Sequence, residues 1–159
     1  MKKQLTYDQL LVKAEDYCAQ SEHCVADVME KLYAWGCSDK SARERIAEHL
    51  IDNNFINHDR YCHAYTHDKM LYQGWGKQKI QMMLRLKHLP EDNIEQALAD
   101  IDDQTYEDVL RKVIDTKLSF FKIDDNAEIR LLRFLTQRGF EYDRAIRSIE
   151  AALKEKRQR

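Results

Sequence analysis

The segment VMEKLYAWGCSDKSARERI, Val28 to Ile46, decides the fold, because its pattern of apolar and small residues occurs three times in the chain. The five positions that define the pattern in the first copy are Val28, Leu32, Gly36, Ala42 and Ile46. Moving 52 residues on gives Ile80, Leu84, His88, Ile94 and Leu98, and a further 51 residues gives Leu131, Leu135, Gly139, Ala145 and Ile149. A spacing kept through three copies indicates an internal repeat, which decides the architecture of the whole chain.

Each copy has the pattern of two helices joined by a short turn, with a further helix before them. The sequence therefore predicts an all-α fold of three tandem three-helix repeats, at residues 1–54, 55–102 and 103–159. A unit of about 50 residues buries only a small core, so neighbouring units must dock on one another. We expect an elongated array that uses its faces, rather than an enclosed pocket, to bind partners.

Turn and cap signals refine this prediction. Gly36 and Gly139 fall just past a helix, where glycine adopts the left-handed conformation that ends many helices. His88 stands at the matching position of the second copy. Candidates for helix N-caps are Ser21, Ser38, Asn57 and Asp124.

Composition limits the class of protein. With one Pro, four Gly and 34% charged residues in 159, the chain is typical of a helical protein with few loops. We expect a cytoplasmic protein, because no apolar run approaches the ~20 residues that cross a bilayer and the first residues lack the apolar core of a signal peptide. The four cysteines form no C-x-x-C pair, and we expect free thiols.

Charge is distributed unevenly along the chain, although the net charge is only -2. Residues 69–88 contain five Lys or Arg and no acid, whereas residues 91–108 contain eight acids and no Lys or Arg. The basic block includes Trp75, at a position where the other copies have His23 and Asn126. Gly76, by contrast, occupies a position that is small in all three copies, which favours close helix approach. Trp75 is therefore either a plug in the seam to an adjacent repeat or an aromatic contact for a base or a protein surface.

Four segments in this order resemble the RecX family of recombinase regulators. They are SEHCVADVMEKLYAWG (21–36), NNFINHDRYCHAYTHDK (53–69), GWGKQKIQMMLRLKHL (74–89) and RLLRFLTQRGFEYDRAI (130–146). The resemblance covers nearly the whole chain. Asn54 and His88 stand where the family usually has Gly, and Trp75-Gly76-Lys77 replaces a Gly-Pro form. These departures affect local turn geometry.

The resemblance implies a curved rod and a role as a modulator of the RecA recombinase. Members of the family are held to lie in the groove of the RecA filament on DNA and to inhibit filament growth, strand exchange and coprotease activity, without catalysis of their own. It implies no cofactor, a monomeric protein, and contact with the backbone of single- or double-stranded DNA. The candidate contact residues are Trp75, Lys77, Lys79, Arg85 and Lys87 in the basic block, Arg130, Arg133 and Arg138 in the third copy, and the basic tail Lys154, Lys156, Arg157 and Arg159.

Two alternatives belong to other classes. A helix-turn-helix transcription regulator would need a basic or polar recognition helix, yet EDNIEQALADI in the second copy is acidic, and SDKSARERIAEHL in the first offers only Arg43 and Arg45. A metal site would use His58, Cys62, His63 and His67, but the pairs 58/62 and 63/67 point in different directions around one helix. The sequence has no phosphate-cradling Gly loop and no nucleophile elbow, so we predict that the protein is not an enzyme.

Overall fold

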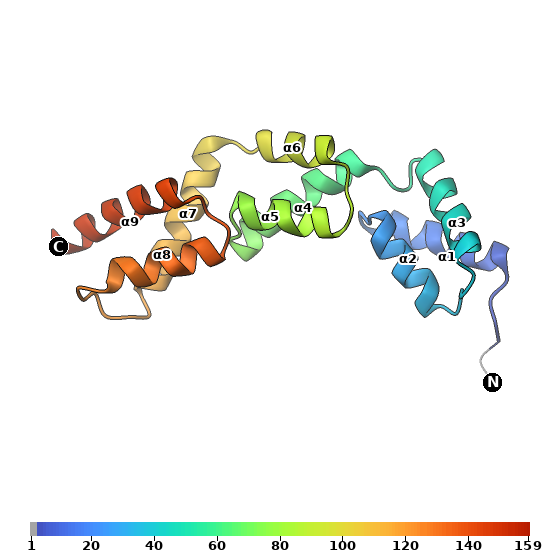
Figure 1. Cartoon of the computed structure of the whole chain (residues 1–159), viewed down its shortest axis with the longest axis horizontal. Helices are drawn as coiled ribbons and strands as arrows, with labels where there is room; N and C mark the ends of the chain where they lie inside the picture. The colour runs from blue at the N-terminus through green and yellow to red at the C-terminus, as the bar shows by residue number, and fades with distance from the viewer. Residues whose placement is uncertain (1–2) are drawn as a thin grey trace.

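The computed structural model describes residues 3–159, and within this range the chain forms nine α-helices and no strand. The helices are α1 (Tyr7–Gln20), α2 (Val25–Ala34), α3 (Lys40–Asp52), α4 (His58–Gln73), α5 (Lys77–Leu86), α6 (Glu91–Ala99), α7 (Asp103–Leu118), α8 (Ala127–Gln137) and α9 (Tyr142–Arg157). They form three groups of three that follow one another along a curved rod (Figure 1). The predicted fold, three tandem three-helix repeats in an elongated array, is confirmed.

The apolar positions of the repeat form the interior of each group. Val28, Leu32 and Ile46 in the first group are fully buried, and so are their counterparts in the third group. The one exception among the twelve apolar repeat positions is Leu98, which is only partly buried, while its neighbour Ala97 faces the core. The repeat pattern therefore marks the residues that fold each unit.

The buried residues form two clusters rather than three. One cluster belongs to α1–α3 and the segment that follows them, and is built around Leu10, Val28, Leu32, Ile46 and Leu50. The other is continuous through α4–α9 and also includes Cys24, from the residues just before α2. The second and third repeats thus share one core, whereas the first repeat has a core of its own.

Left-handed residues follow the second helix of each repeat, at the predicted positions. Gly36 and Gly139 have φ values of 98° and 93°. His88, at the equivalent position, adopts φ 61°, and Asn54 adopts φ 62°. The second repeat therefore makes the same turn as its neighbours with a residue for which this conformation costs about 1–2 kcal/mol.

The N-caps agree only in part with the prediction. Asn57 caps α4 as predicted, since its side chain accepts a hydrogen bond from Arg60 N. The other three predictions were wrong. The N-cap residues are Cys24 rather than Ser21 for α2, Asp39 rather than Ser38 for α3, and Asn126 rather than Asp124 for α8. In each case the N-cap lies one to three residues after the predicted cap residue.

Candidate functional site

The basic block forms a cluster where α4 ends and α5 begins. We call Lys69, Trp75, Lys77 and Lys79 the lysine–tryptophan junction. The Nζ atoms of Lys69 and Lys79 lie 5.0 Å and 4.4 Å from the centroid of the half-buried Trp75 ring. The edge of Trp75 also meets Tyr65, with a centroid distance of 6.4 Å. An indole ring with two ammonium groups close to it gives a surface that is at once aromatic and cationic.

The backbone of the third repeat fixes this junction. Helix α4 ends before its C-cap Gly74, which has φ 66°, and α5 starts three residues later at Lys77. Gly76 N donates to Arg138 O at 2.8 Å, and Gln78 N donates to Gly139 O at 3.0 Å. A Cβ atom on Gly76 would lie 2.3 Å from the carbonyl carbon of Gly139, so only glycine allows this approach. The predicted close approach at Gly76 is confirmed.

A buried tyrosine adds a second tie at the same place. Tyr106 of α7 is fully buried, and its hydroxyl accepts a hydrogen bond from Lys77 N at 3.0 Å and donates to the Glu141 carboxylate. Burial raises the pKa of Tyr106 well above its ordinary value. The Lys77 ammonium lies 4.9 Å from the centroid of the same ring. The first turn of α5 is therefore held by α7 and by the loop between α8 and α9.

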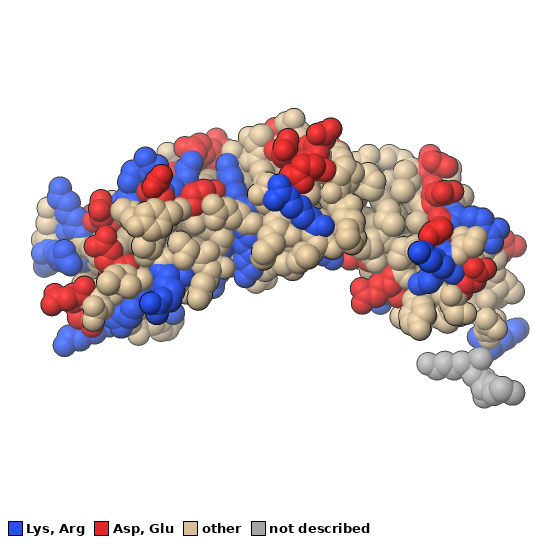
Figure 2. Space-filling view, in the orientation of Figure 1, with Lys and Arg blue, Asp and Glu red and all other residues tan. Residues whose placement is uncertain are grey.

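The lysines of the junction are not neutralised by neighbouring carboxylates. Within residues 3–159, no Asp or Glu oxygen lies within 4.0 Å of the ammonium groups of Lys69, Lys77 or Lys79. The first turn of α5 contains no acidic residue either. Figure 2 shows Lys and Arg side chains beside the N-terminal end of α5, and Asp and Glu side chains gathered over α6. The junction thus offers positive charge to an external anion.

Lys69 is a member of the junction that was not among the predicted contact residues. It lies in α4, six residues before Trp75 and on the other side of the turn at Gly74. The hydrogen bond from Trp75 N to Lys69 O, at 3.1 Å, brings the two residues together. A helical spacing does not reveal this contact, because the chain leaves the helix between them.

The two remaining predicted residues of the basic block are engaged within the protein. Arg85 donates to both carboxylate oxygens of Glu91, and this hydrogen bonding raises the pKa of Arg85. Lys87 Nζ lies 2.8 Å from Asp27 Oδ1 of the first repeat. Burial by itself would lower the pKa of Lys87, but the hydrogen bond to Asp27 raises it above its ordinary value. Both residues therefore have a structural use, and their role as partner contacts stays a prediction.

The three predicted arginines of the third repeat differ in whether their side chains are engaged within the protein. Arg130 pairs with Asp124 and donates to Lys122 O, which secures the loop before α8. Arg138 donates to Gln73 O and so crosses from the third repeat to the second. Arg133 is exposed on α8, and the side chains of the tail residues Lys154, Lys156, Arg157 and Arg159 are exposed on α9 and beyond it.

The residues of the proposed metal site have other surroundings. Cys62 is fully buried in the core of the second repeat, and His63 lies 2.7 Å from Asp100 Oδ2. In the part of the chain that the structure describes, no group of three or more His, Cys, Asp or Glu residues could hold a metal ion. All four cysteines are buried and free.

The helix that a helix-turn-helix regulator would place on DNA also has a composition unsuited to binding DNA. Helix α6 begins with Glu91 and Asp92, and Glu91 is already paired with Arg85. In the first repeat, the guanidinium groups of Arg43 and Arg45 lie over the rings of Tyr33 and Tyr7.

None of the helices within residues 3–159 has the length and apolar character that a membrane crossing requires.

Comparisons with known proteins connect this geometry to one family. The family model described as "RecX, second three-helix domain" matches residues 57–98, the segment that contains α4, α5, all but the last residue of α6, and the whole junction. The protein named "Regulatory protein RecX" of Vibrio campbellii (strain ATCC BAA-1116) is 25% identical over 126 residues, which cover 79% of each chain. The protein of the same name from Clostridium botulinum (strain Eklund 17B / Type B) is 30% identical over 120 residues, which cover 73% of this chain and 55% of that protein.

The crystal structure of RecX from Lactobacillus salivarius has the same arrangement of helices. It superposes with a TM-score of 0.73 at 20% identity, over 91% of this chain and 95% of that chain. This similarity supports the fold, and the sequence matches support the relationship. In sequence and in fold, the chain is therefore similar to the RecX family of regulatory proteins.

Proposed function

We propose that this protein binds the RecA recombinase filament on DNA and modulates it. The modulation is inhibition of the recombinase, ATPase and coprotease activities, in the setting of DNA repair and the SOS response. The protein acts in the cytoplasm as a monomer and without catalysis or a cofactor. Similarity to RecX regulatory proteins supports this role, and the observation that carries the choice of surface is the lysine–tryptophan junction.

The physical argument rests on shape and charge. A curved rod of helices can follow a helical groove over several subunits, so that each repeat meets a different part of the filament. A filament on DNA offers phosphates and acidic side chains, and both attract the un-neutralised ammonium groups of Lys69, Lys77 and Lys79. Since Gly76 and Tyr106 fix the backbone at the junction, these lysines are presented from a rigid support.

The test is a double charge reversal, Lys77→Glu with Lys79→Glu, measured by co-sedimentation with RecA on single-stranded DNA and by inhibition of RecA ATPase. We expect binding and inhibition to fall sharply. The free energy of unfolding should fall by only about 1–2 kcal/mol, because the two cation–π contacts that are lost contribute about 0.5–1 kcal/mol each when exposed to solvent. Lys40→Glu on α3 is the matched control, since Lys40 is exposed and distant from the junction.

Salt dependence then identifies the kind of partner at the junction. Each phosphate contact that is lost should flatten the log–log slope of binding against salt by about 0.7–0.9, whereas a contact with protein alone lowers affinity without that signature. Trp75→Ala should weaken binding without changing the slope if the ring touches the partner, and lower stability instead if the ring serves packing. Inhibition at the wild-type level by the double charge reversal would remove the junction from the interface.

A further inference from the structure

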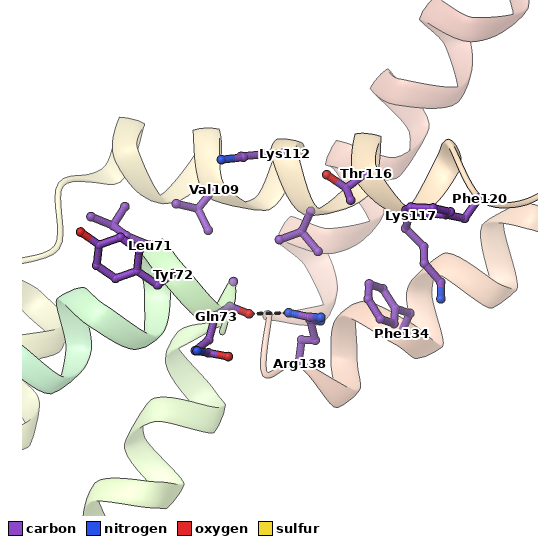
Figure 3. A pocket seen from close by; sticks show the side chains of 12 residues that line it. Leu71, Tyr72, Gln73, Val109, Lys112, Thr116, Lys117, Phe120, Phe134 and Arg138 are labelled. Carbon is purple, nitrogen blue, oxygen red and sulfur yellow. Dashed lines mark hydrogen bonds between the residues drawn. The ribbon is translucent and has the colours of Figure 1, made fainter.

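A groove separate from the junction lies where the end of α4 meets α7 and α8. It has a volume of about 520 Å³ and is open to solvent along one side. Its walls come from the last turn of α4, from the length of α7 and from α8, as Figure 3 shows. The residues that line it are Leu71, Tyr72, Gln73, Gly74, Val109, Lys112, Val113, Thr116, Lys117, Phe120, Phe134 and Arg138.

Two aromatic rings stand at opposite ends of this groove. Tyr72 lies at the end formed by α4, and Phe120 lies at the other end, just past α7 (Figure 3). Their exposed fractions are 78% and 81%, the largest of any exposed large hydrophobic residue in the described part of the chain. The residues of α7 between them rise about 1.5 Å each, so the rings are separated by roughly two to three helical turns. Neither ring is needed to fill the core.

The charged residues of the groove are all cations. Lys112, Lys117 and Arg138 line it, and no Asp or Glu does. On its floor, the Lys117 ammonium and the Arg138 guanidinium lie 4.4 Å and 4.9 Å from the centroid of one ring, that of Phe134. Among the described residues, no carboxylate oxygen lies within 4.0 Å of the ammonium groups of Lys112 or Lys117. These two lysines are therefore available to an anionic ligand.

We infer that this groove binds a short segment of single-stranded nucleic acid. Bases stack on Tyr72 and Phe120, and phosphates contact Lys112 and Lys117 between them. Proteins that bind single strands combine open aromatic faces with a cationic groove. Every base has a face that can stack on an aromatic ring, and every phosphate linkage has a charge that a cation can neutralise. A duplex fits less well, because its bases already stack on one another. A peptide anchor would need a closed and dry apolar pocket, whereas these rings are exposed to water.

This site goes beyond the proposed function, because it requires no recombinase. The probe is a fluorescein-labelled oligothymidylate, with binding to the purified chain followed by fluorescence anisotropy at several salt concentrations. Tyr72→Ala and Phe120→Ala should each weaken binding about tenfold without changing the salt slope. Lys112→Gln and Lys117→Gln should each flatten the slope by about 0.7. Tyr33→Ala is the matched control, because Tyr33 is 64% exposed on α2, beside Arg43 and far from the groove.

A second measurement locates the strand directly. Photo-crosslinking with an oligonucleotide that carries 5-iododeoxyuridine should give adducts on Tyr72 or Phe120, mapped by mass spectrometry. An oligouridylate and a hairpin duplex serve as comparison ligands, to distinguish DNA from RNA and single strands from double strands. We expect the hairpin to bind more weakly than either single strand.

Three outcomes would overturn the inference. The first is no binding of oligothymidylate at low salt, and the second is crosslinks confined to the junction at Trp75. The third is that the groove variants keep full affinity for the oligonucleotide but lose binding to RecA, which would make the groove a protein-docking surface. Lys77→Glu with Lys79→Glu tests the proposed function separately. Suppose that this variant loses inhibition while the groove variants bind the oligonucleotide as tightly as the wild type does. The proposed function then stands, and only the inference about the groove fails.

Discussion

At the scale of single residues, three glycines show how local conformation and long-range packing make separate demands. Gly36 has φ 98°, and a Cβ added there would meet no atom within 4 Å. Gly76 has φ -81°, which suits any residue, but a Cβ there would collide with Gly139. Gly139 has both constraints, since its φ is 93° and a Cβ would lie 2.4 Å from Lys79 Cβ. The chain thus contains each constraint alone and the two together.

Substitution of each glycine by alanine should separate the two costs. Gly36→Ala should lower the free energy of unfolding by about 1–2 kcal/mol, because only the left-handed backbone is strained. Gly76→Ala should cost about 1–3 kcal/mol through overpacking, and Gly139→Ala should cost the most, because both effects apply. Urea denaturation followed by circular dichroism measures this order. Equal losses for Gly36→Ala and Gly139→Ala would show that the seam between the second and third repeats yields without cost.

The left-handed glycines could be predicted from the sequence, whereas the partner of Gly76 could not. A Gly just past a periodic helix is a local signal for the left-handed conformation, and Gly36 and Gly139 both adopt that conformation. The contact between Gly76 and Gly139 joins residues in two different repeats. Repeat alignment showed only that position 76 is small, because alignment compares equivalent positions and does not show which copies touch.

At the scale of helices, the repeat pattern predicted the order and core faces of the elements better than their ends or their surface contacts. Helix α2 begins at Val25, four residues after the predicted cap Ser21, because Cys24 packs into the neighbouring core and the chain turns there. Helix α5 was predicted from the repeat, and its charges indicated only that it could be a contact surface. The ion pair of Arg85 with α6 and that of Lys87 with the first repeat depend on packing that no local pattern contains.

The packing of α4 against α6 includes a pair that should respond to pH. The hydrogen bond to Asp100 raises the pKa of His63, and the same bond lowers the pKa of Asp100. The folded state therefore holds the proton on His63 more tightly than the unfolded chain does. This contribution to stability is fully present below the ordinary histidine pKa of about 6.5 and is lost as pH rises through the higher folded value. At the acid end, the share of Asp100 is lost as pH falls through its lowered pKa.

His63→Ala should therefore lower the melting temperature more at about pH 5.5 than at about pH 8.5, on either side of the ordinary histidine pKa. Asp100→Asn should remove most of this pH-dependent difference, while the contacts of His63 with the carbonyl and carboxylate of Asp59 keep the rest. The measurement is thermal denaturation by circular dichroism at both pH values. A difference between wild type and His63→Ala that is the same at both would show that the pair adds nothing to stability.

At the scale of the whole molecule, the three repeats are alike in pattern but unequal in their connections. The second and third share one core and exchange backbone hydrogen bonds through Gly76, Gln78 and Arg138. The first has a separate core, and among residues 3–159 none of α1–α3 packs extensively against a helix of α4–α9. The sequence predicted three equivalent units. It could not predict this inequality, because equivalent positions make different contacts in different copies: a Cβ on Gly139 would meet Lys79, whereas one on Gly36 would meet no atom within 4 Å.

Two ion pairs join the first repeat to the second. Lys87 lies 2.8 Å from Asp27, and Arg60 lies 2.8 Å from Glu22, with Cys24 packed beside them. Burial of Asp27 would raise its pKa, but the hydrogen bonds from Lys87 and from Cys24 N lower it. Both charges of this pair are thus stabilised in the folded state, at a place where few apolar contacts assist them.

Removal of the Lys87–Asp27 pair should therefore loosen the first repeat without unfolding it. In Lys87→Gln, we expect amide hydrogen exchange to speed up at the start of α2 and in the turn before α6, while the cores around Leu32 and Leu110 keep their protection. Spin labels on α3 and α9 should give a broader distance distribution by electron double resonance. Arg85→Gln is the matched control, since it breaks an exposed pair within one repeat and should leave that distribution unchanged. If Lys87→Gln also leaves it unchanged, Cys24 and its apolar neighbours are sufficient to fix the first repeat against the second, and the rod is as rigid there as it is at Gly76.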